Sequence, residues 1–417
     1  MTRSLLHPSR RRAVTVRLNL AVAALMAGTL ATGCASGTSA AQQAGDRTPL
    51  QQERQLKRDA DAITALGVSG VQARVVDAGG RNVTATSGVA DLKTRTPVPA
   101  DGYFRIASVT KAFVATVVLQ LAGEGRLSLD DPVDRRLPGV VSGNGNDGGK
   151  ITIRHLLQHT SGVHDVYPPD YASAADFAKR RYDLVEPEQI VAGAMGHSPD
   201  FARPGKGWVY SNTGYVLLGM IIQRVTGHPW HAEVRDRIVR PLGLAHTFWP
   251  GTSPELPRPF ARSYQRFRPG EPLTDVTEQV SMGLNGEAGL VSTTADLNAF
   301  FRALLGGRLL RPAQLAQMKR TVRVGERFQP LMPGARDGLG LFSRPLSCGG
   351  RYWGHEGGDS GWITAVGVSA DGRRSVAVSL TGTIAESDEH VLKVSAAESR
   401  LVEDALCAPP NGAPARN

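Results

Sequence analysis

Residues Phe104–Phe113 read FRIASVTKAF and join a short extended segment to a helical one. Within this stretch Ser108 stands three residues before Lys111. A helix that begins near Ser108 places both side chains on one face. The serine hydroxyl then lies at the positive end of the helix dipole, and a lysine in a poorly hydrated cleft can lose its charge. The pair is a candidate activated nucleophile, and a helix-capping serine beside a solvated lysine is the alternative.

The segment WVYSNTGY, residues 208–215, precedes a strongly apolar helical pattern. Tyr210 could relay the proton of a serine, and the amide of Asn212 could bind a substrate amide. The alternative is a loop in which Asn212 only caps the helix that follows.

The segment YWGHEGGDSGW, residues 352–362, predicts the beginning of a strand near His355. Gly357 and Gly358 would allow a substrate backbone to lie against the edge of that strand. A glycine-rich turn is the alternative.

Strand patterns occur at both ends of the chain and helical patterns fill its middle. Residues 71–91 predict two strands joined by a turn at Gly79–Gly80, and a hairpin is expected at Asp371–Gly372. Amphipathic helices are expected over 51–66 and 387–406. The simplest packing is a single α+β catalytic domain over residues 51–407, with a site in the cleft between its two subdomains. The sheet subdomain takes about 51–108 and 286–407, and a helical subdomain of about 109–285 is inserted.

The N-terminus has the pattern of an export signal. A basic start is followed by 15 apolar residues, which are too few for a typical membrane span. Cys34 follows at a site that resembles a bacterial lipobox, with Ala31 where leucine is more usual. We therefore expect residues 1–34 to direct export. The mature protein would be anchored by lipid at Cys34 on the outer face of the cell membrane, or secreted.

The charge of the chain does not suggest nucleic-acid binding. Half of the formal net charge of +10 comes from five arginines in residues 1–34, which contain no acidic residue. The remaining excess is mild and forms no basic run with interleaved aromatics. Residues 35–50 predict a flexible tether, and residues 408–417 a disordered tail.

The chain has three cysteines, at positions 34, 348 and 407. If Cys34 carries a lipid, Cys348 and Cys407 can pair in an oxidising compartment. Two buried free thiols are the alternative.

Three motifs together resemble a known family. Ser108-Val-Thr-Lys111, Tyr210-Ser-Asn212 and His355-Glu-Gly357 occur in the order and approximate spacing found in serine D-alanyl-D-alanine carboxypeptidases and class C β-lactamases. Flanking segments such as ITIRHLLQHTSGV and GLVSTTADLNAFF are similar too, and the resemblance covers roughly residues 60–405. It implies the β-lactamase/transpeptidase-like fold, an antiparallel sheet with flanking helices and an all-helical subdomain.

The resemblance also implies roles for individual residues. Ser108 would be the acylated nucleophile, and Lys111 and Tyr210 would jointly transfer protons. Asn212 would orient the substrate amide, and His355 stands where related lactamases carry lysine. The backbone N–H groups of Ser108 and Gly358 would form the oxyanion hole, with Gly357 beside them.

Glu356 departs from the family pattern, which usually has threonine or serine at this position. A side chain that points into the cleft would repel a free substrate carboxylate, unless an arginine such as Arg344 or Arg351 intervened. Because a strand alternates its faces, Glu356 could instead point away from the site. We favour the inward orientation by a small margin.

The expected activity is that of an exported D-alanyl-D-alanine carboxypeptidase acting on peptidoglycan-type peptides through an acyl-enzyme, with β-lactams as acylating inhibitors. An esterase or β-lactamase of the same fold, and a penicillin-binding sensor or scaffold without turnover, are the alternatives. His155 and His159 have zinc-ligand spacing, but no glutamate follows His155, so packing or capping is favoured. We expect a monomer without cofactor or metal.

Overall fold

The computed structural model describes residues 48–166, 171–268, 270–280, 285–382 and 387–407, all within the unit Ala44–Asn417. The predicted signal segment, Cys34, nearly all of the tether and the tail at 408–417 lie outside the described residues. The first helix, α1 (Pro49–Thr64), begins inside the last two residues of the expected tether, because Thr48 and Gln51 form a capping box and Pro49 takes the first helical position.

An antiparallel sheet of eight strands organises the fold, in the order β2-β1-β14-β13-β12-β11-β10-β9. Two strands from the N-terminal part of the chain, β2 and β1, join six from its C-terminal part, because β1 pairs with β14 from Gly70↔Thr381 to Val76↔Ser375. This confirms the predicted α+β fold with an antiparallel sheet. The strands are β1 (Gly70–Val76), β2 (Asn82–Gly88), β9 (Val322–Arg323), β10 (Arg336–Asp337), β11 (Phe342–Pro345), β12 (Arg351–Asp359), β13 (Trp362–Ser369) and β14 (Ser375–Thr381).

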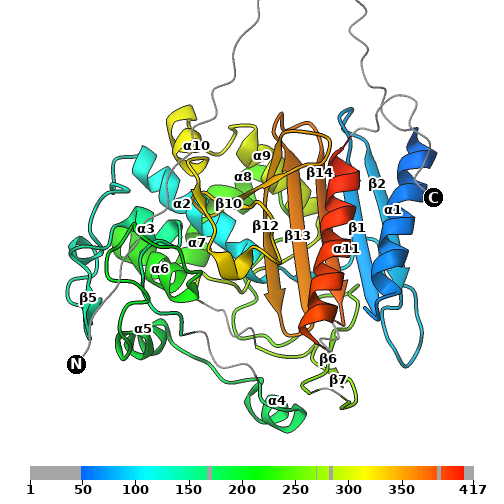
Figure 1. Ribbon diagram of the computed structural model, residues 1–417, viewed down its shortest axis with the longest axis horizontal. Coiled ribbons are helices and arrows are strands. Elements are labelled where there is room, and N and C mark those ends of the chain that lie inside the picture. Colours follow the sequence, from blue (N-terminus) through cyan, green and yellow to red (C-terminus); the bar gives the residue numbers. More distant parts are fainter. Residues whose placement is uncertain (1–47, 167–170, 269, 281–284, 383–386, 408–417) are drawn as a thin grey trace, which may run out of the picture. The chain divides into compact units, whose positions relative to one another are not determined.

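Helices cover both faces of this sheet. Alternate residues of β14 enter different cores: Val376 and Val378 join the core under α1 and α11 (Asp388–Leu406), while Ala377 joins the core that contains α9 (Thr294–Leu305). The period of two explains why residues on both sides of this strand are buried. Figure 1 shows α1 and α11 side by side across one face of the sheet.

The helical region packs beside the sheet around α2 (Thr110–Gly123). α2 is buried from Thr110 to Leu119 because other helices pack around it. The rings of Phe113 in α2 and Phe300 in α9 stack with their centres 3.6 Å apart. The other helices are α3 (Ile153–Leu157), α4 (Ala174–Arg180), α5 (Pro187–Met195), α6 (Asn212–Thr226), α7 (Trp230–Val234), α8 (Arg240–Leu242) and α10 (Pro312–Met318). Short strand pairs are β3 (Phe104–Arg105) with β8 (Val291–Ser292), β4 (Ser142–Gly143) with β5 (Asn146–Asp147), and β6 (Tyr264–Gln265) with β7 (Thr274–Asp275).

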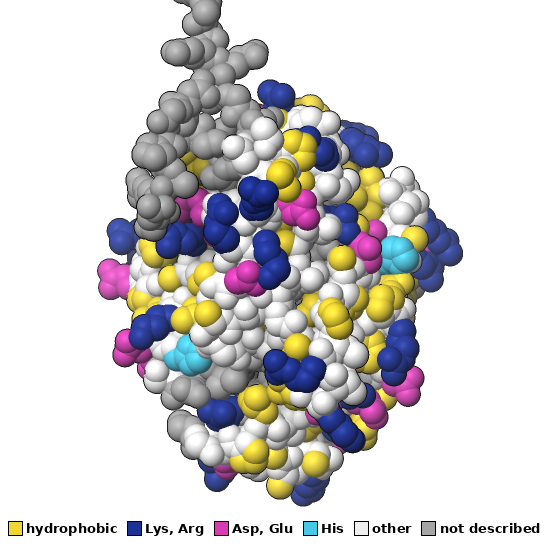
Figure 2. Space-filling model, turned by 90° about the vertical axis from the view of Figure 1, so that its right-hand side faces the viewer, with side chains coloured by type: hydrophobic (Ala, Val, Ile, Leu, Met, Phe, Trp, Pro, Cys, Tyr) yellow, Lys and Arg dark blue, Asp and Glu magenta, His cyan; other side chains and the backbone are white. Residues whose placement is uncertain are grey.

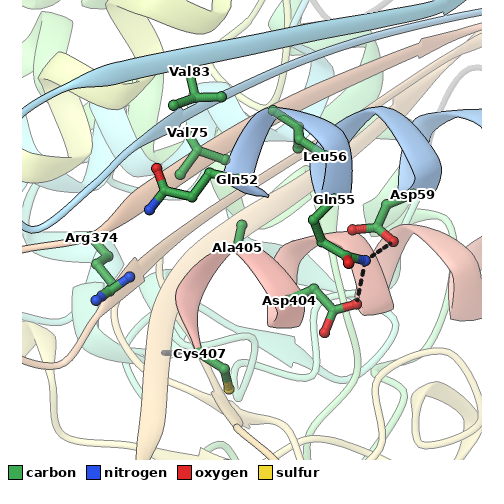
Figure 3. A pocket seen from close by; sticks show the side chains of 10 residues that line it. All are labelled: Gln52, Gln55, Leu56, Asp59, Val75, Val83, Arg374, Asp404, Ala405 and Cys407. Atoms are coloured by element: carbon green, nitrogen blue, oxygen red, sulfur yellow. Dashed lines mark hydrogen bonds between the residues drawn. The ribbon is translucent and has the colours of Figure 1, made fainter. Parts of the chain in front are cut away.

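The C-terminal helix α11 is linked to the turn between β11 and β12 and to α1. Cys348, in the turn between β11 and β12, forms a disulfide with Cys407 at the end of α11, which confirms the predicted pair. Gln55 of α1 donates hydrogen bonds to Asp59, at 2.8 Å, and to Asp404 of α11, at 3.5 Å. Figure 3 shows Gln55, Asp59, Asp404 and Cys407 among the side chains that line a small pocket between the two helices and the sheet.

Surface charge is mixed. Figure 2 shows the face on the α1 side, where Lys and Arg side chains are spread among Asp and Glu. Within the described part of the chain, no helix is both long and apolar enough to span a membrane.

Candidate active site

The turn that carries Ser108 links β3 to α2 through the 3₁₀ turn Ala107–Val109. Ala107 has a φ of +46°, a conformation that residues with a Cβ rarely adopt, so the surrounding contacts must hold the turn in place. Gly357 of β12 supplies one of these contacts: a Cβ at that position would lie 2.4 Å from the carbonyl oxygen of Ile106 and 3.0 Å from the backbone nitrogen of Ser108. Glycine therefore allows β12 to lie against the Ser108 turn.

Lys111 is fully buried, and its ammonium nitrogen donates three hydrogen bonds. The acceptors are Ser108 Oγ at 2.9 Å, Asn212 Oδ1 at 2.8 Å and the backbone oxygen of Glu287 at 2.6 Å. Burial lowers the pKa of Lys111 to about 7, while the carboxylates of Glu287 and Asp165 oppose the change. Near neutral pH the free amine can therefore accept a proton from Ser108, with which it forms a hydrogen bond.

Tyr210 borders the same serine. Tyr210 is half-buried; desolvation raises the pKa of its phenol, and a hydrogen bond with the side chain of Ser108 works in the opposite direction. The Lys111 nitrogen lies 5.1 Å from the centre of the Tyr210 ring. A neutral phenol beside the serine can relay a proton but is a poor base at neutral pH.

The ring of His159 packs against the ring of Tyr210. The two ring centres are 4.2 Å apart, and the Nδ1 atom of His159 accepts a hydrogen bond of 3.1 Å from the backbone nitrogen of Ser211. Burial holds the pKa of His159 well below its usual value, with the Lys111 charge adding to the effect. Its sequence partner His155 caps α3 through Thr152, as the packing or capping interpretation predicted. Within the described residues, no group of three or more His, Cys, Asp or Glu side chains is placed to hold a metal ion.

Asn212 is held by Asp165, a residue that sequence reasoning missed. The Asp165 carboxylate accepts hydrogen bonds from the backbone of Asn212 (2.6 Å) and Thr213 (3.1 Å) and from Asn212 Nδ2 (3.0 Å). It therefore caps α6 and fixes the amide so that its oxygen faces Lys111. Asp165 stands two residues after the segment ITIRHLLQHTSGV, but an acidic residue in a loop gives no signal of this long-range contact.

The third motif lies inside β12 rather than at its beginning, since the strand starts four residues earlier, at Arg351. The pairing of β12 with β11 ends at Gly354. Beyond Gly354 this edge of β12 is not paired with β11, so the Ser108 turn and a ligand can lie against it. His355 is buried, and its Nδ1–H donates to the backbone oxygen of Glu356 at 2.5 Å. Burial lowers the pKa of His355 to about 3, with the Lys111 charge acting in the same direction, so the ring is neutral at physiological pH.

Glu356 points away from the cleft, which corrects the favoured inward orientation. Its carboxylate forms an ion pair with Arg344 of β11, and Arg344 also donates to Ser399 Oγ of α11 at 3.0 Å. The alternation of the strand explains the result: His355 and Gly357 face the Ser108 turn, so the residue between them must face α11. The acid therefore has a structural partner and does not meet a substrate. Gly358 follows, and a Cβ there would meet no atom within 4 Å.

The geometry assembles a hydroxyl, a buried amine of lowered pKa, a neutral phenol and an amide around one point on the free edge of a strand. These groups are sufficient for acyl transfer to a serine. Fold and site together define the class: the protein is a serine hydrolase of the β-lactamase and penicillin-binding protein superfamily.

The comparison with family models places the chain more narrowly. Residues 52–399 match the model described as "Beta-lactamase", so the chain belongs to that family. This confirms the resemblance read from the three motifs.

Two curated relatives illustrate the range of the family. The chain is 29% identical over 301 residues to penicillin-binding protein 4* of Bacillus subtilis, which covers 69% of this chain and 63% of the relative. It is 37% identical over 197 residues to esterase EstB of Burkholderia gladioli, which covers 45% of this chain and 47% of the relative. The chain thus spans less than two thirds of the length of both curated relatives.

Two solved structures match more completely. A D-stereospecific amidohydrolase from Streptomyces sp. superposes with a TM-score of 0.74 and 39% identity, covering 82% of this chain and 98% of the other. A D-amino acid amidase from Ochrobactrum anthropi SV3 gives a TM-score of 0.70 and 27% identity, covering 84% and 99%. Both resemblances include the sheet and the helical region.

Proposed function

We propose that this protein hydrolyses amide or peptide bonds whose acyl group is a D-amino acid residue, through an acyl-enzyme on Ser108. The observation that carries the proposal is the buried Lys111, which is bonded at once to Ser108 Oγ and to the amide of Asn212. Lys111 in its neutral form accepts the serine proton, and Tyr210 passes a proton onward to the leaving nitrogen. The backbone N–H groups of Ser108 and Gly358 receive the oxyanion.

The third motif supports an amidase over a carboxypeptidase. His355 is neutral, and Glu356 is turned away and paired with Arg344, so this motif supplies no cation for a free substrate carboxylate. A substrate with an uncharged group beyond the scissile bond is therefore favoured. The 39% identity to a D-stereospecific amidohydrolase supports the same choice.

The test compares substrates that differ in one feature at a time. The purified full-length protein is assayed with D- and L-phenylalanine amide, and with an N-acylated D-Ala-D-Ala peptide and its C-terminal amide. We expect D over L by at least about tenfold in kcat/KM, and the blocked peptide over the free acid. Preference for the free acid would return the D-alanyl-D-alanine carboxypeptidase to first place, and equal rates on both enantiomers would overturn D-specificity.

An esterase is the second candidate, because the segment shared with esterase EstB is 37% identical. Hydrolysis of a nitrophenyl ester with no turnover of either amide would select it. Stoichiometric labelling by a β-lactam without turnover of any substrate would indicate a penicillin-binding sensor. We retain export and lipid attachment at Cys34 as part of the proposal, to be checked by mass spectrometry of the cell-derived protein.

A further inference from the structure

A second carboxyl group lies beside the catalytic lysine. Glu287 is fully buried in the segment between α8 and β8, and its backbone oxygen accepts the 2.6 Å hydrogen bond from Lys111. Neither oxygen of its side chain has a well-formed hydrogen bond within the described part of the chain. The backbone N–H groups of Asn285 and of Glu287 itself favour its charged form, as does the charge of Lys111. An uncompensated buried carboxyl costs stability, so its place beside Lys111 calls for a function.

Few charged or titratable groups in the described part of the chain interact with Glu287. The charged or titratable groups that act on it or that it acts on are Lys111 of α2, Asp165 before α6, and the phenol of Tyr210. Burial raises the pKa of Glu287 to about 7, the Lys111 charge opposes this, and Asp165 adds to it. Asp165 already accepts three hydrogen bonds at the start of α6, whereas Glu287 has no such support.

We propose that Glu287 is a positioning residue for catalysis: its buried carboxyl, beside Lys111, sets the pH at which that lysine releases its proton. When Glu287 is ionised, it attracts the ammonium form and keeps Lys111 protonated. When Glu287 is protonated, this attraction is lost, so Lys111 releases its proton more readily and more of it is present as the free base that accepts the Ser108 proton. The two groups titrate as a pair within one closed site.

The test needs no knowledge of the natural substrate. The full-length wild type, Glu287→Gln and Glu287→Asp are reacted with a fluorophosphonate probe from pH 5 to pH 9, and the rate of covalent labelling is followed. The control is Glu398→Gln, which alters another buried carboxyl, one that is coupled to Glu356 and Arg344 instead of Lys111. An amidase assay that fails, with normal labelling, would count against the proposed substrate and not against this role.

Glu287→Gln should move the acid limb of the labelling rate to lower pH by about one unit, giving about tenfold faster labelling at pH 5 but less than about twofold at pH 7. Glu287→Asp should retain most of the wild-type profile, and Glu398→Gln all of it. A limb that stays in place or moves upward in Glu287→Gln, or an equal shift in Glu398→Gln, overturns the proposal.

A second measurement remains decisive if Glu287→Gln fails to fold. The chain has eight lysines, so the ¹³Cε resonance of Lys111 can be assigned by comparison with Lys111→Met and titrated in the wild type. Coupling to Glu287 predicts a titration that spans two steps. A single step overturns the proposal.

Discussion

Glu356 and Arg344 form an ion pair on the face of the sheet that lies under α11, one residue away from His355, which faces Ser108. The arrangement joins the strand of the third motif to the C-terminal helix. It also removes the one acidic side chain of that motif from contact with substrate.

Glu356→Thr should therefore leave substrate preference unchanged. The ratio of kcat/KM between a peptide with a free C-terminal carboxylate and its amide should stay within about twofold of the wild type. Stability should fall by about 1–3 kcal/mol, because Arg344 loses its partner in a largely buried position. Urea denaturation measures the loss, and Glu356→Thr combined with Arg344→Met should recover part of it. A selective gain on the free acid would show that the acid reaches the cleft after all.

Replacement of Gly357 should disturb the nucleophile. In Gly357→Ala the new methyl group meets the backbone of Ile106 and Ser108, which must move away from β12. We expect labelling of Ser108 by a β-lactam to slow at least about tenfold. Gly358→Ala is the matched control, since its Cβ enters open space and its N–H is kept. Similar rates for the two variants would contradict the close packing of β12 on the Ser108 turn.

Covalent labelling should require Ser108. Ser108→Ala should abolish the adduct with a β-lactam or phosphonate, as detected by intact-protein mass spectrometry, while the exposed Ser142→Ala behaves as wild type. Tyr210→Phe should slow labelling by about 10²–10⁴-fold without a change in fold, since it removes a proton relay. An adduct of undiminished yield in Ser108→Ala would place the nucleophile elsewhere.

The pH dependence of acylation should follow Lys111. Its pKa in the fold is lowered to about 7, so the fraction of free amine, and with it the rate, should rise from pH 5.5, reach half of its maximum near pH 7 and level above about pH 8. His355, with a pKa of about 3, stays neutral over this range and should add no limb. A stopped-flow profile of wild type and His355→Asn checks this. Loss of the limb at pH 7 in His355→Asn would assign the titration to the histidine.

The disulfide should matter for stability and not for chemistry. Cys348 and Cys407 are separated by 59 residues, so their bond restricts the unfolded chain by about 4 kcal/mol in the entropic account. The double variant Cys348→Ser/Cys407→Ser should unfold at lower urea concentration and label with the same rate constant below its transition. Two alkylatable thiols in the non-reduced protein would rule the bond out.

Much of the fold follows from local patterns in the sequence. The turn at Gly79–Gly80, the hairpin at Asp371–Gly372 and the helix after Ser387 are set by residues that are neighbours in the chain, and the structure has each of them. The order of strands, helices and strands was sufficient to predict a sheet built from both ends. The three motifs identified Ser108, Lys111, Tyr210 and Asn212 because their spacing in the chain is distinctive.

Only the tertiary structure revealed the contacts between segments that are distant in the sequence. Asp165 holds Asn212 across 47 residues, and Glu287 meets Lys111 across 176. An isolated acid in a loop gives no periodicity and no motif, so neither contact could be read from the chain. The sequence could not predict on which face of β12 the Glu356 side chain lies, for the same reason. Strand alternation places neighbouring side chains on opposite faces, but only the packing of Gly357 against Ser108 shows which face carries the site.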